Sequence, residues 1–133
     1  MTKIVKGYKF RIYPNKVQRV LLENTFGCCR FVWNHLLVEA NTKYDEWKQN
    51  NSLEKPNLSF VGLANKLPDL KQEQDKEWLS DVSSVALQQK VKDLAESFTN
   101  FFGKINKKKS GYPQFKKKGY NESFRLVGVA FKL

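Results

Sequence analysis

The stretch CCRFVWNHLLVEANTKYDEWK, residues 28–48, carries the longest helical pattern in the sequence. Its apolar side chains recur at steps of three and four residues, which places them on one face of a helix. This stripe consists of Val32, Trp33, Leu36, Leu37, Ala40, Tyr44 and Trp47. We therefore predict a long amphipathic helix that packs one face into the core.

A shorter helix is predicted directly before this one. Asn15 is a typical N-cap residue, and Gln18 stands three residues later, as in a capping box. Gly27 should end this helix, because glycine is favoured just beyond a helix C-terminus. The two predicted helices would form a helix-turn-helix unit over residues 15–48.

The N-terminal residues favour a strand. In the stretch KGYKFRIY, residues 6–13, apolar Tyr8, Phe10 and Ile12 alternate with Lys9 and Arg11. A period of two gives a strand one apolar face and one basic face.

Further helices are predicted downstream of residue 48. Ser59 should cap a short helix that ends near Pro68, and Ser83 or Ser84 should begin a long helix that ends at Gly103. After Gly103 the pattern changes to a lysine-rich linker, the aromatic and basic stretch GYPQFKKKG at 111–119, and a predicted strand at 123–133. The predicted order is a strand, about four helices, then strands, which is an α+β organisation.

The charge is concentrated at the two ends of the chain. The formal net charge is +11, and it divides into +6 over residues 1–20, −3 over 21–103 and +8 over 104–133. If the ends meet in space, they form one positive face, which is the electrostatic footprint of nucleic-acid binding. A membrane surface, an acidic partner or no specific partner are the alternatives that charge alone leaves open.

Catalytic and metal-binding patterns are absent from the sequence. His35 is the single histidine, and Cys28 and Cys29 are adjacent, so they form neither a CxxC zinc motif nor a disulfide. We expect no metal and no cofactor in this chain. Because no signal peptide or apolar run of membrane-spanning length is present, we expect a cytoplasmic protein that makes no membrane contact.

Cations and aromatic rings alternate in two segments, 8–13 and 112–118. Lysine and arginine bind phosphates, and exposed rings stack on bases. Alternatively, Tyr112 and Phe115 pack inside the fold and leave only the lysines to solvent. The cationic and aromatic candidates for nucleic-acid binding are Lys6, Lys9, Arg11, Lys16, Arg30, Lys107, Lys108, Lys109, Tyr112, Lys116, Lys117, Lys118 and Arg125.

Several blocks together resemble the TnpB/OrfB family of transposon-encoded, RNA-guided nucleases. They are KGYKFRIYPN at 6–15, TFGCCRFVWNH at 25–35, EWL at 77–79, ALQQ at 86–89, NFF at 100–102, GYPQFK at 111–116 and SFR at 123–125. The blocks occur in the family's order along nearly the whole chain.

This resemblance implies an architecture and partners. Residues 1–14 and 104–133 would supply strands of a partial, oligonucleotide-binding-like β-barrel, and residues 15–103 would form an inserted helical recognition lobe. The partners would be a structured guide RNA and double-stranded DNA. By position, Phe60, Ser84 and Gln88 would face a short target-adjacent DNA motif, and the Gln88 amide suits bidentate pairing with adenine.

The family's catalytic parts lie downstream of every matching block. Family members cut DNA with a RuvC-like domain whose carboxylates hold magnesium, and they carry a zinc-binding insert. Because two-metal cleavage needs those carboxylates, we expect no enzymatic activity from this chain alone. It would be a truncated or decayed copy, a split-gene product that works with a separate nuclease polypeptide, or a deliberately shortened chain.

The alternative interpretation is a helix-turn-helix transcriptional regulator that acts through residues 15–48. It has less support, because the first turn of its second helix carries only Arg30.

Overall fold

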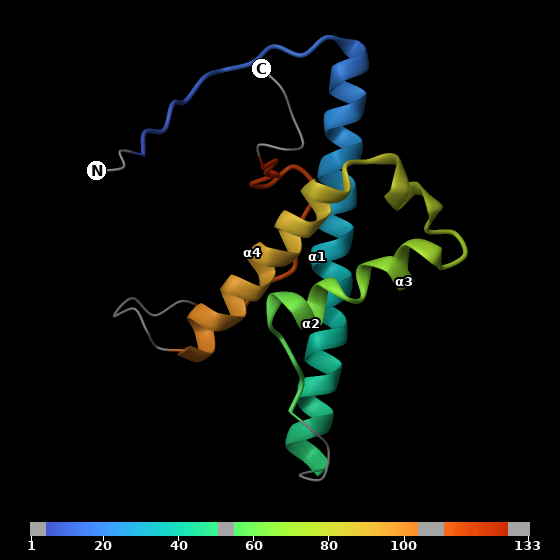
Figure 1. The fold of residues 1–133 in the computed structure, drawn as a ribbon, viewed down its shortest axis with the longest axis vertical. Coiled ribbons are helices and arrows are strands. Elements are labelled where there is room, and N and C mark those ends of the chain that lie inside the picture. Colours follow the sequence, from blue (N-terminus) through green and yellow to red (C-terminus); the bar gives the residue numbers. More distant parts are fainter. Residues whose placement is uncertain (1–4, 51–54, 104–110, 128–133) are drawn as a thin grey trace.

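The computed structural model describes residues 5–50, 55–103 and 111–127, and these residues form a helical fold. Its elements are α1 (Lys16–Asn50), α2 (Phe60–Ala64), α3 (Leu67–Gln72), the 3-10 helix η1 (Glu77–Asp81) and α4 (Ser84–Gly103). Figure 1 shows α4 crossing the long helix α1, with α2 and α3 beside its middle. No helix within these ranges is long and apolar enough to span a membrane.

The N-terminus of α1 confirms the predicted capping box. The Asn15 backbone N–H donates to Gln18 Oε1 at 3.0 Å, and the Gln18 N–H donates to Asn15 Oδ1 at 2.9 Å. These two bonds satisfy backbone donors that the first turn of a helix leaves unpaired. The helix therefore begins at Lys16, where the sequence pattern placed it.

The predicted break at Gly27 is wrong, because α1 continues without interruption from Lys16 to Asn50. A glycine inside a helix costs only about 0.5–1 kcal/mol relative to alanine. The residues that follow, Cys28, Cys29 and Val32, are buried at 5%, 1% and 0% exposure. Their burial against the rest of the core offsets the cost of Gly27, so residues 15–48 contain no turn between two helices.

The core lies where α1 and α4 face each other. The predicted stripe of α1 is buried from Val32 to Ala40, and Leu87, Val91, Leu94 and Phe98 of α4 are at most 1% exposed. Each fully buried side chain of this size contributes roughly 1.5–3 kcal/mol of transfer free energy. Leu63, Leu67, Leu70 and Leu79 extend the core under the short helices.

The short helices follow local rules with one correction. Ser59 Oγ accepts from the Gly62 N–H at 3.3 Å, which confirms Ser59 as the cap of α2. The prediction that the short helix ends near Pro68 is wrong, because α2 ends at Ala64 and Pro68 lies in the first turn of α3. Proline is tolerated there because the N–H that it lacks would have no partner inside the helix.

The α+β fold class and the partial β-barrel are wrong for the described part of the chain. Residues 5–15 are extended and, apart from half-buried Pro14, exposed, with Phe10 at 81% and Ile12 at 70% exposure, and they form no strand. Residues 111–127 likewise contain no strand, and the rest of the predicted strand, 128–133, lies outside the described residues. Alternating polarity assigns the two faces of a strand, but a strand also needs a neighbour to pair its backbone groups. The division of the chain into segments 1–14, 15–103 and 104–133 stays a prediction.

Candidate nucleic-acid interface

Residues 111–127 form an extended strap that is held on α1 by hydrogen bonds between side chains and backbone. The amide of Asn34 pairs with both backbone groups of Lys116: Nδ2 donates to the carbonyl at 3.0 Å, and Oδ1 accepts from the N–H at 2.8 Å. One residue earlier on α1, Trp33 Nε1 donates to the Gln114 carbonyl at 2.8 Å. These bonds fix the backbone of the strap without a partner strand.

The strap runs antiparallel to α1. Tyr112 donates through its hydroxyl to Asn41 Oδ1, well along the helix. At the other end of the strap, the ring centroid of Phe124 lies 5.4 Å from that of Phe26, nearer the N-terminus of α1. The Tyr112 ring also packs edge-on against Phe98 of α4, with centroids 5.6 Å apart. Tyr112 therefore anchors the strap, which supports the packing alternative for this residue.

The strap determines how the three consecutive lysines are presented. Lys116 is half-buried, with its Nζ 4.3 Å from the centroid of the Trp33 ring. Burial lowers the pKa of Lys116, and the nearby charge of Lys90 lowers it further. Lys117 and Lys118 are exposed. The lysine run thus has one desolvated member and two that are free to meet solvent or a ligand.

A tight turn follows the lysines. Gly119 has a φ of +85°, a conformation that glycine adopts without strain. Glu122 Oε1 accepts from the Gly119 N–H at 2.8 Å and lies 3.1 Å from Arg30 Nη1. Arg30, a predicted nucleic-acid contact, therefore also has a structural role in holding this turn against α1.

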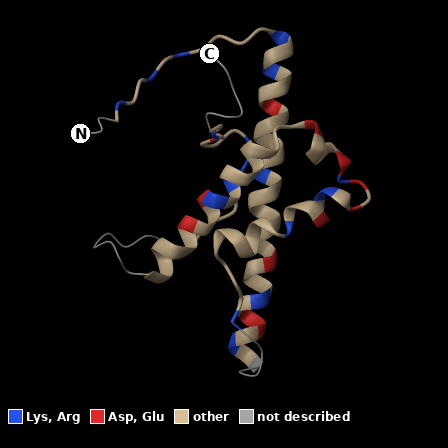
Figure 2. Cartoon of the chain, viewed as in Figure 1, with Lys and Arg blue, Asp and Glu red and all other residues tan. Residues whose placement is uncertain are grey.

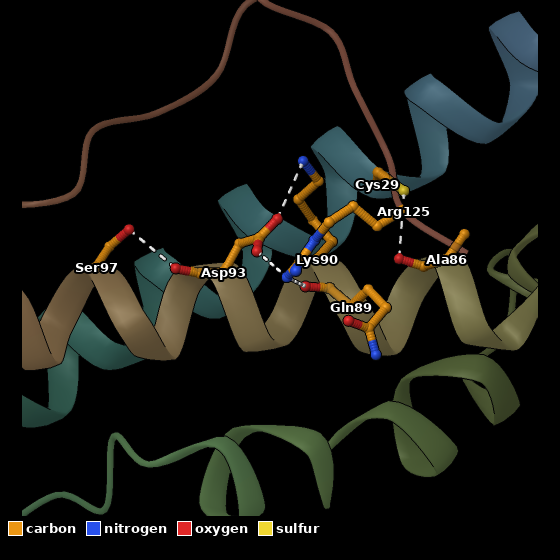
Figure 3. A network of polar contacts seen from close by, with 7 residues as sticks. All are labelled: Cys29, Ala86, Gln89, Lys90, Asp93, Ser97 and Arg125. Carbon is orange, nitrogen blue, oxygen red and sulfur yellow. Dashed lines mark hydrogen bonds and ion pairs between the residues drawn. The ribbon is translucent and has the colours of Figure 1, made fainter. Parts of the chain in front are cut away.

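Arg125, another predicted contact, is held by α4. Its guanidinium forms an ion pair with Asp93 and donates to the Gln89 carbonyl at 3.5 Å. Lys90 Nζ lies 3.8 Å from the other carboxylate oxygen of Asp93, so two cations share one acid, as Figure 3 shows. Lys90 is only 4% exposed and was not among the predicted site residues.

The N-terminal basic residues lie on the extended segment that leads into α1. Lys6, Lys9, Arg11 and Lys16 are exposed, and no acid separates them, as Figure 2 shows. The rings between these cations are exposed as well, with Tyr8 at 77%. Cations and apolar rings therefore face solvent together, a combination that suits binding to phosphates and unstacked bases.

The two basic segments lie at different levels of α1, because Lys116 is bonded to Asn34 near the middle of the helix and residues 5–15 precede its N-terminus. The strap runs toward the N-terminal half of that helix, and residues 5–15 leave from its N-terminus (Figure 1). No hydrogen bond, ion pair or ring contact connects residues 5–15 with residues 111–127. Their joining into one cationic face stays a prediction, and Lys107, Lys108 and Lys109 lie outside the described residues.

The residues predicted to face DNA are accessible. Phe60 begins α2 and is 38% exposed, and Ser84 and Gln88 lie one turn apart on the exposed side of α4. Because α2 packs against α4, these side chains belong to neighbouring elements.

A groove of about 1010 Å³ lies between α1, η1 and the turn of the strap. Phe31 and Trp78 line it with ring centroids 5.0 Å apart. Its acids, Glu23, Asp81 and Glu122, outnumber its cations, Arg30 and Lys118. Arg30 and Lys118 are both predicted nucleic-acid contacts, so the groove borders the predicted cationic surface, but its own excess of acids favours a polyanion less than the strap does.

The single histidine has a local partner. His35 Nε2 lies 3.2 Å from Glu39 Oε1, and its ring stacks on Phe31 with centroids 5.5 Å apart. Within residues 5–50, 55–103 and 111–127, no three His, Cys, Asp or Glu side chains gather as a metal site would require. Cys28 and Cys29 are both free and buried.

Comparisons with known proteins identify the family. A family model from OrfB proteins, described as a helix-turn-helix domain, matches residues 1–49. A protein of Escherichia coli strain K12 named as RNA-guided DNA endonuclease InsQ is 32% identical over 123 residues, covering 92% of this chain and 28% of InsQ. A Streptomyces pristinaespiralis protein named as RNA-guided DNA endonuclease is 36% identical over 118 residues, covering 87% of this chain and 26% of that protein. The chain belongs to the TnpB/OrfB family.

A third relative is short. Virulence protein VsdF of Salmonella dublin is 30% identical over 115 residues, which cover 86% of this chain and 95% of VsdF. By contrast, the chain spans only 26–28% of the length of the two relatives named as endonucleases. Although the matched TnpB/OrfB model is described as a helix-turn-helix domain, the corresponding residues from Lys16 onward form one continuous helix here.

Proposed function

We propose that this chain is a nucleic-acid-binding portion of a TnpB/OrfB-type RNA-guided DNA endonuclease. It would hold a structured guide RNA and target-adjacent double-stranded DNA. The observation that carries the proposal is the exposed alternation of cations and rings at residues 6–13, upstream of a helix along which the strap presents Lys117 and Lys118. Both segments lie at the basic ends of a chain whose net charge is +11.

The physical basis is the release of counterions. Each cation that neutralises a phosphate frees a condensed counterion, so the binding constant falls as salt rises. The exposed rings of Tyr8 and Phe10 add stacking, worth about 1–3 kcal/mol per base in single-stranded complexes. Stacking does not select a sequence, which fits a protein whose target is chosen by guide pairing.

The exposed side of α4 is proposed to face the target-adjacent DNA. Gln88 would donate and accept hydrogen bonds at the edge of an adenine, and Phe60 on neighbouring α2 would contact bases or sugars through its partly exposed ring. Ser84 lies one turn before Gln88 and is small enough to let DNA approach α4 closely.

Cleavage is proposed to depend on a different segment. The relatives named as endonucleases extend far beyond the matched portion, so the magnesium-binding carboxylates would lie elsewhere, on the same polypeptide or on a separate one. This portion would bind and position the nucleic acids for that reaction.

A salt titration tests the proposal. Lys116, Lys117 and Lys118 are changed together to alanine, and binding to a structured RNA is measured by fluorescence anisotropy from low to moderate salt. The logarithmic salt slope should fall by roughly 0.7–0.9 for each lost phosphate contact. The control changes Lys48, Lys55 and Lys71 to alanine. These lysines lie outside the strap, and replacing them lowers the net charge by the same amount. Equal slopes for the two triple variants would contradict a strap-based interface.

A further inference from the structure

A small pocket lies where α1, α4 and the strap meet. Four cations line it, Arg30, Lys90, Lys116 and Lys117, with Tyr120 and Glu122 beside them. Its volume is about 10 Å³, which is close to the space that one water molecule requires. The pocket therefore accepts a single small atom at its base, while exposed Lys117 and Tyr120 leave its rim open.

The charges around this pocket are not balanced by protein carboxylates. Glu122 is paired with Arg30. Asp93 is shared between Lys90 and Arg125, and its oxygen lies as far as 3.8 Å from Lys90 Nζ. Lys116 has no carboxylate among the ion pairs of the described residues and faces the Trp33 ring instead.

Lys90 is the unusual member of the group. Its side chain is only 5% exposed, and lysine is seldom buried to this degree unless it is paired. Its acid partner Asp93 lies near the limit of ion-pair distance and is shared with Arg125, so a further anion would complete the neutralisation of Lys90. Burial and the nearby charge of Lys90 both lower the pKa of Lys116, as two neighbouring cations would. A bound anion would reduce the repulsion between these cations.

We propose that this pocket binds one non-bridging oxygen of a phosphodiester group. Lys90 and Lys116 would supply the inner ammonium contacts, and Lys117 would contact the same phosphate from the rim. The inference rests on the proposed nucleic-acid-binding function and deepens it by naming a discrete phosphate site that includes a buried lysine.

Two features favour a phosphodiester over a smaller anion. The pocket has room for one oxygen but not for a whole phosphate group, so the remaining atoms of the ligand must lie outside it. Lys117 lines the pocket and is exposed, so it can contact the part of a phosphodiester, or a flanking phosphate, that lies outside the pocket. RNA and DNA share this chemistry, and free phosphate offers the same oxygen without the flanking contacts.

The experiment compares Lys90→Met with Lys71→Met in the full chain. Methionine keeps most of the volume of the lysine stem, and Lys71 on α3 provides the same charge change away from the pocket. Labelled single-stranded RNA and duplex DNA are titrated across a salt series. In parallel, thermal unfolding is followed in sodium phosphate and in sodium chloride at equal ionic strength. Circular dichroism checks folding, and Lys117→Met, at an exposed position, replaces Lys90→Met if that variant does not fold.

Lys90→Met should weaken binding about ten-fold, as expected for a lost charge-assisted contact, and Lys71→Met much less. Its salt slope should fall by about 0.7 with RNA or 0.9 with duplex DNA, and the ligand that shows the loss is the source of the phosphate. If the wild type binds nucleic acid but Lys90→Met and Lys71→Met have equal affinities and salt slopes, the pocket is not a phosphate site. The proposed nucleic-acid-binding function would then still stand. If free phosphate raises the unfolding temperature but Lys90→Met changes the salt slope with neither RNA nor duplex DNA, the pocket binds an adventitious ion only and not a phosphodiester. If the wild type binds neither RNA nor DNA, both proposals fail.

Discussion

Asn34 pairs with Lys116 as one strand pairs with another: its amide satisfies both the N–H and the carbonyl of a residue that is 82 positions away. The strap is thereby fixed on α1 by side chains that project from a helix. This bond pair also sets the position of Lys117 and Lys118, which follow directly. The lysine run and the helical core are therefore coupled through one amide.

Replacing Asn34 with alanine should destabilise the chain by about 1–3 kcal/mol, because two part-buried backbone groups lose their partners. Urea unfolding followed by circular dichroism measures the change. Asn24→Ala, on an exposed position of the same helix, is the matched control and should stay within about 0.5 kcal/mol of wild type. Similar losses in both variants would argue against the pairing.

Asp93→Asn should destabilise the chain by roughly 1–3 kcal/mol, because buried Lys90 would lose its counterion. Glu96→Gln on the same helix makes the same charge change at an exposed position and should have little effect. Thermal unfolding of the two variants at neutral pH provides the comparison. An unchanged Asp93→Asn variant would show that Lys90 does not depend on this carboxylate.

Stability should fall between pH 9 and 11 because of Cys29. Burial raises the pKa of this thiol from 9.0 to about 11, so in that window the unfolded chain releases a proton that the folded chain retains. Fewer protons on the unfolded state mean that the free energy of unfolding declines as pH rises. Cys29→Ala should be less stable at neutral pH but should show a shallower decline, measured by urea unfolding across this range. Parallel pH profiles would contradict a buried, protonated thiol.

Local patterns predicted the helices well. Asn15 and Gln18 form the expected capping box, and the stripe from Val32 to Ala40 is buried, because both features depend on neighbours within one or two helical turns. The predicted helix end at Gly27 is wrong because the local preference of glycine for a helix end is weaker than the burial of the residues that follow it. The alternation of Tyr8, Phe10 and Ile12 defined two faces but could not supply a partner strand.

The site was harder to predict than the helices. The bonds of Trp33 and Asn34 to the strap join residues that are 81 and 82 positions apart in the sequence. A single sequence contains no periodic signal for pairs at such a distance. Lys90 did leave a signal: it lies three residues after Leu87 and four before Leu94, on the apolar face of α4. A cation at such a position is either paired or functional, and this criterion would have identified it.

We expect both basic ends of the chain to bind one and the same nucleic acid. Ultraviolet cross-linking of the full chain to a structured RNA, followed by mass spectrometry of the cross-linked peptides, tests it most directly. We expect adducts in two regions, at Tyr8–Tyr13 and at Tyr112–Lys118, on the same bound RNA. Adducts confined to α1, as a regulator acting through residues 15–48 would give, or to one end of the chain alone, would contradict it.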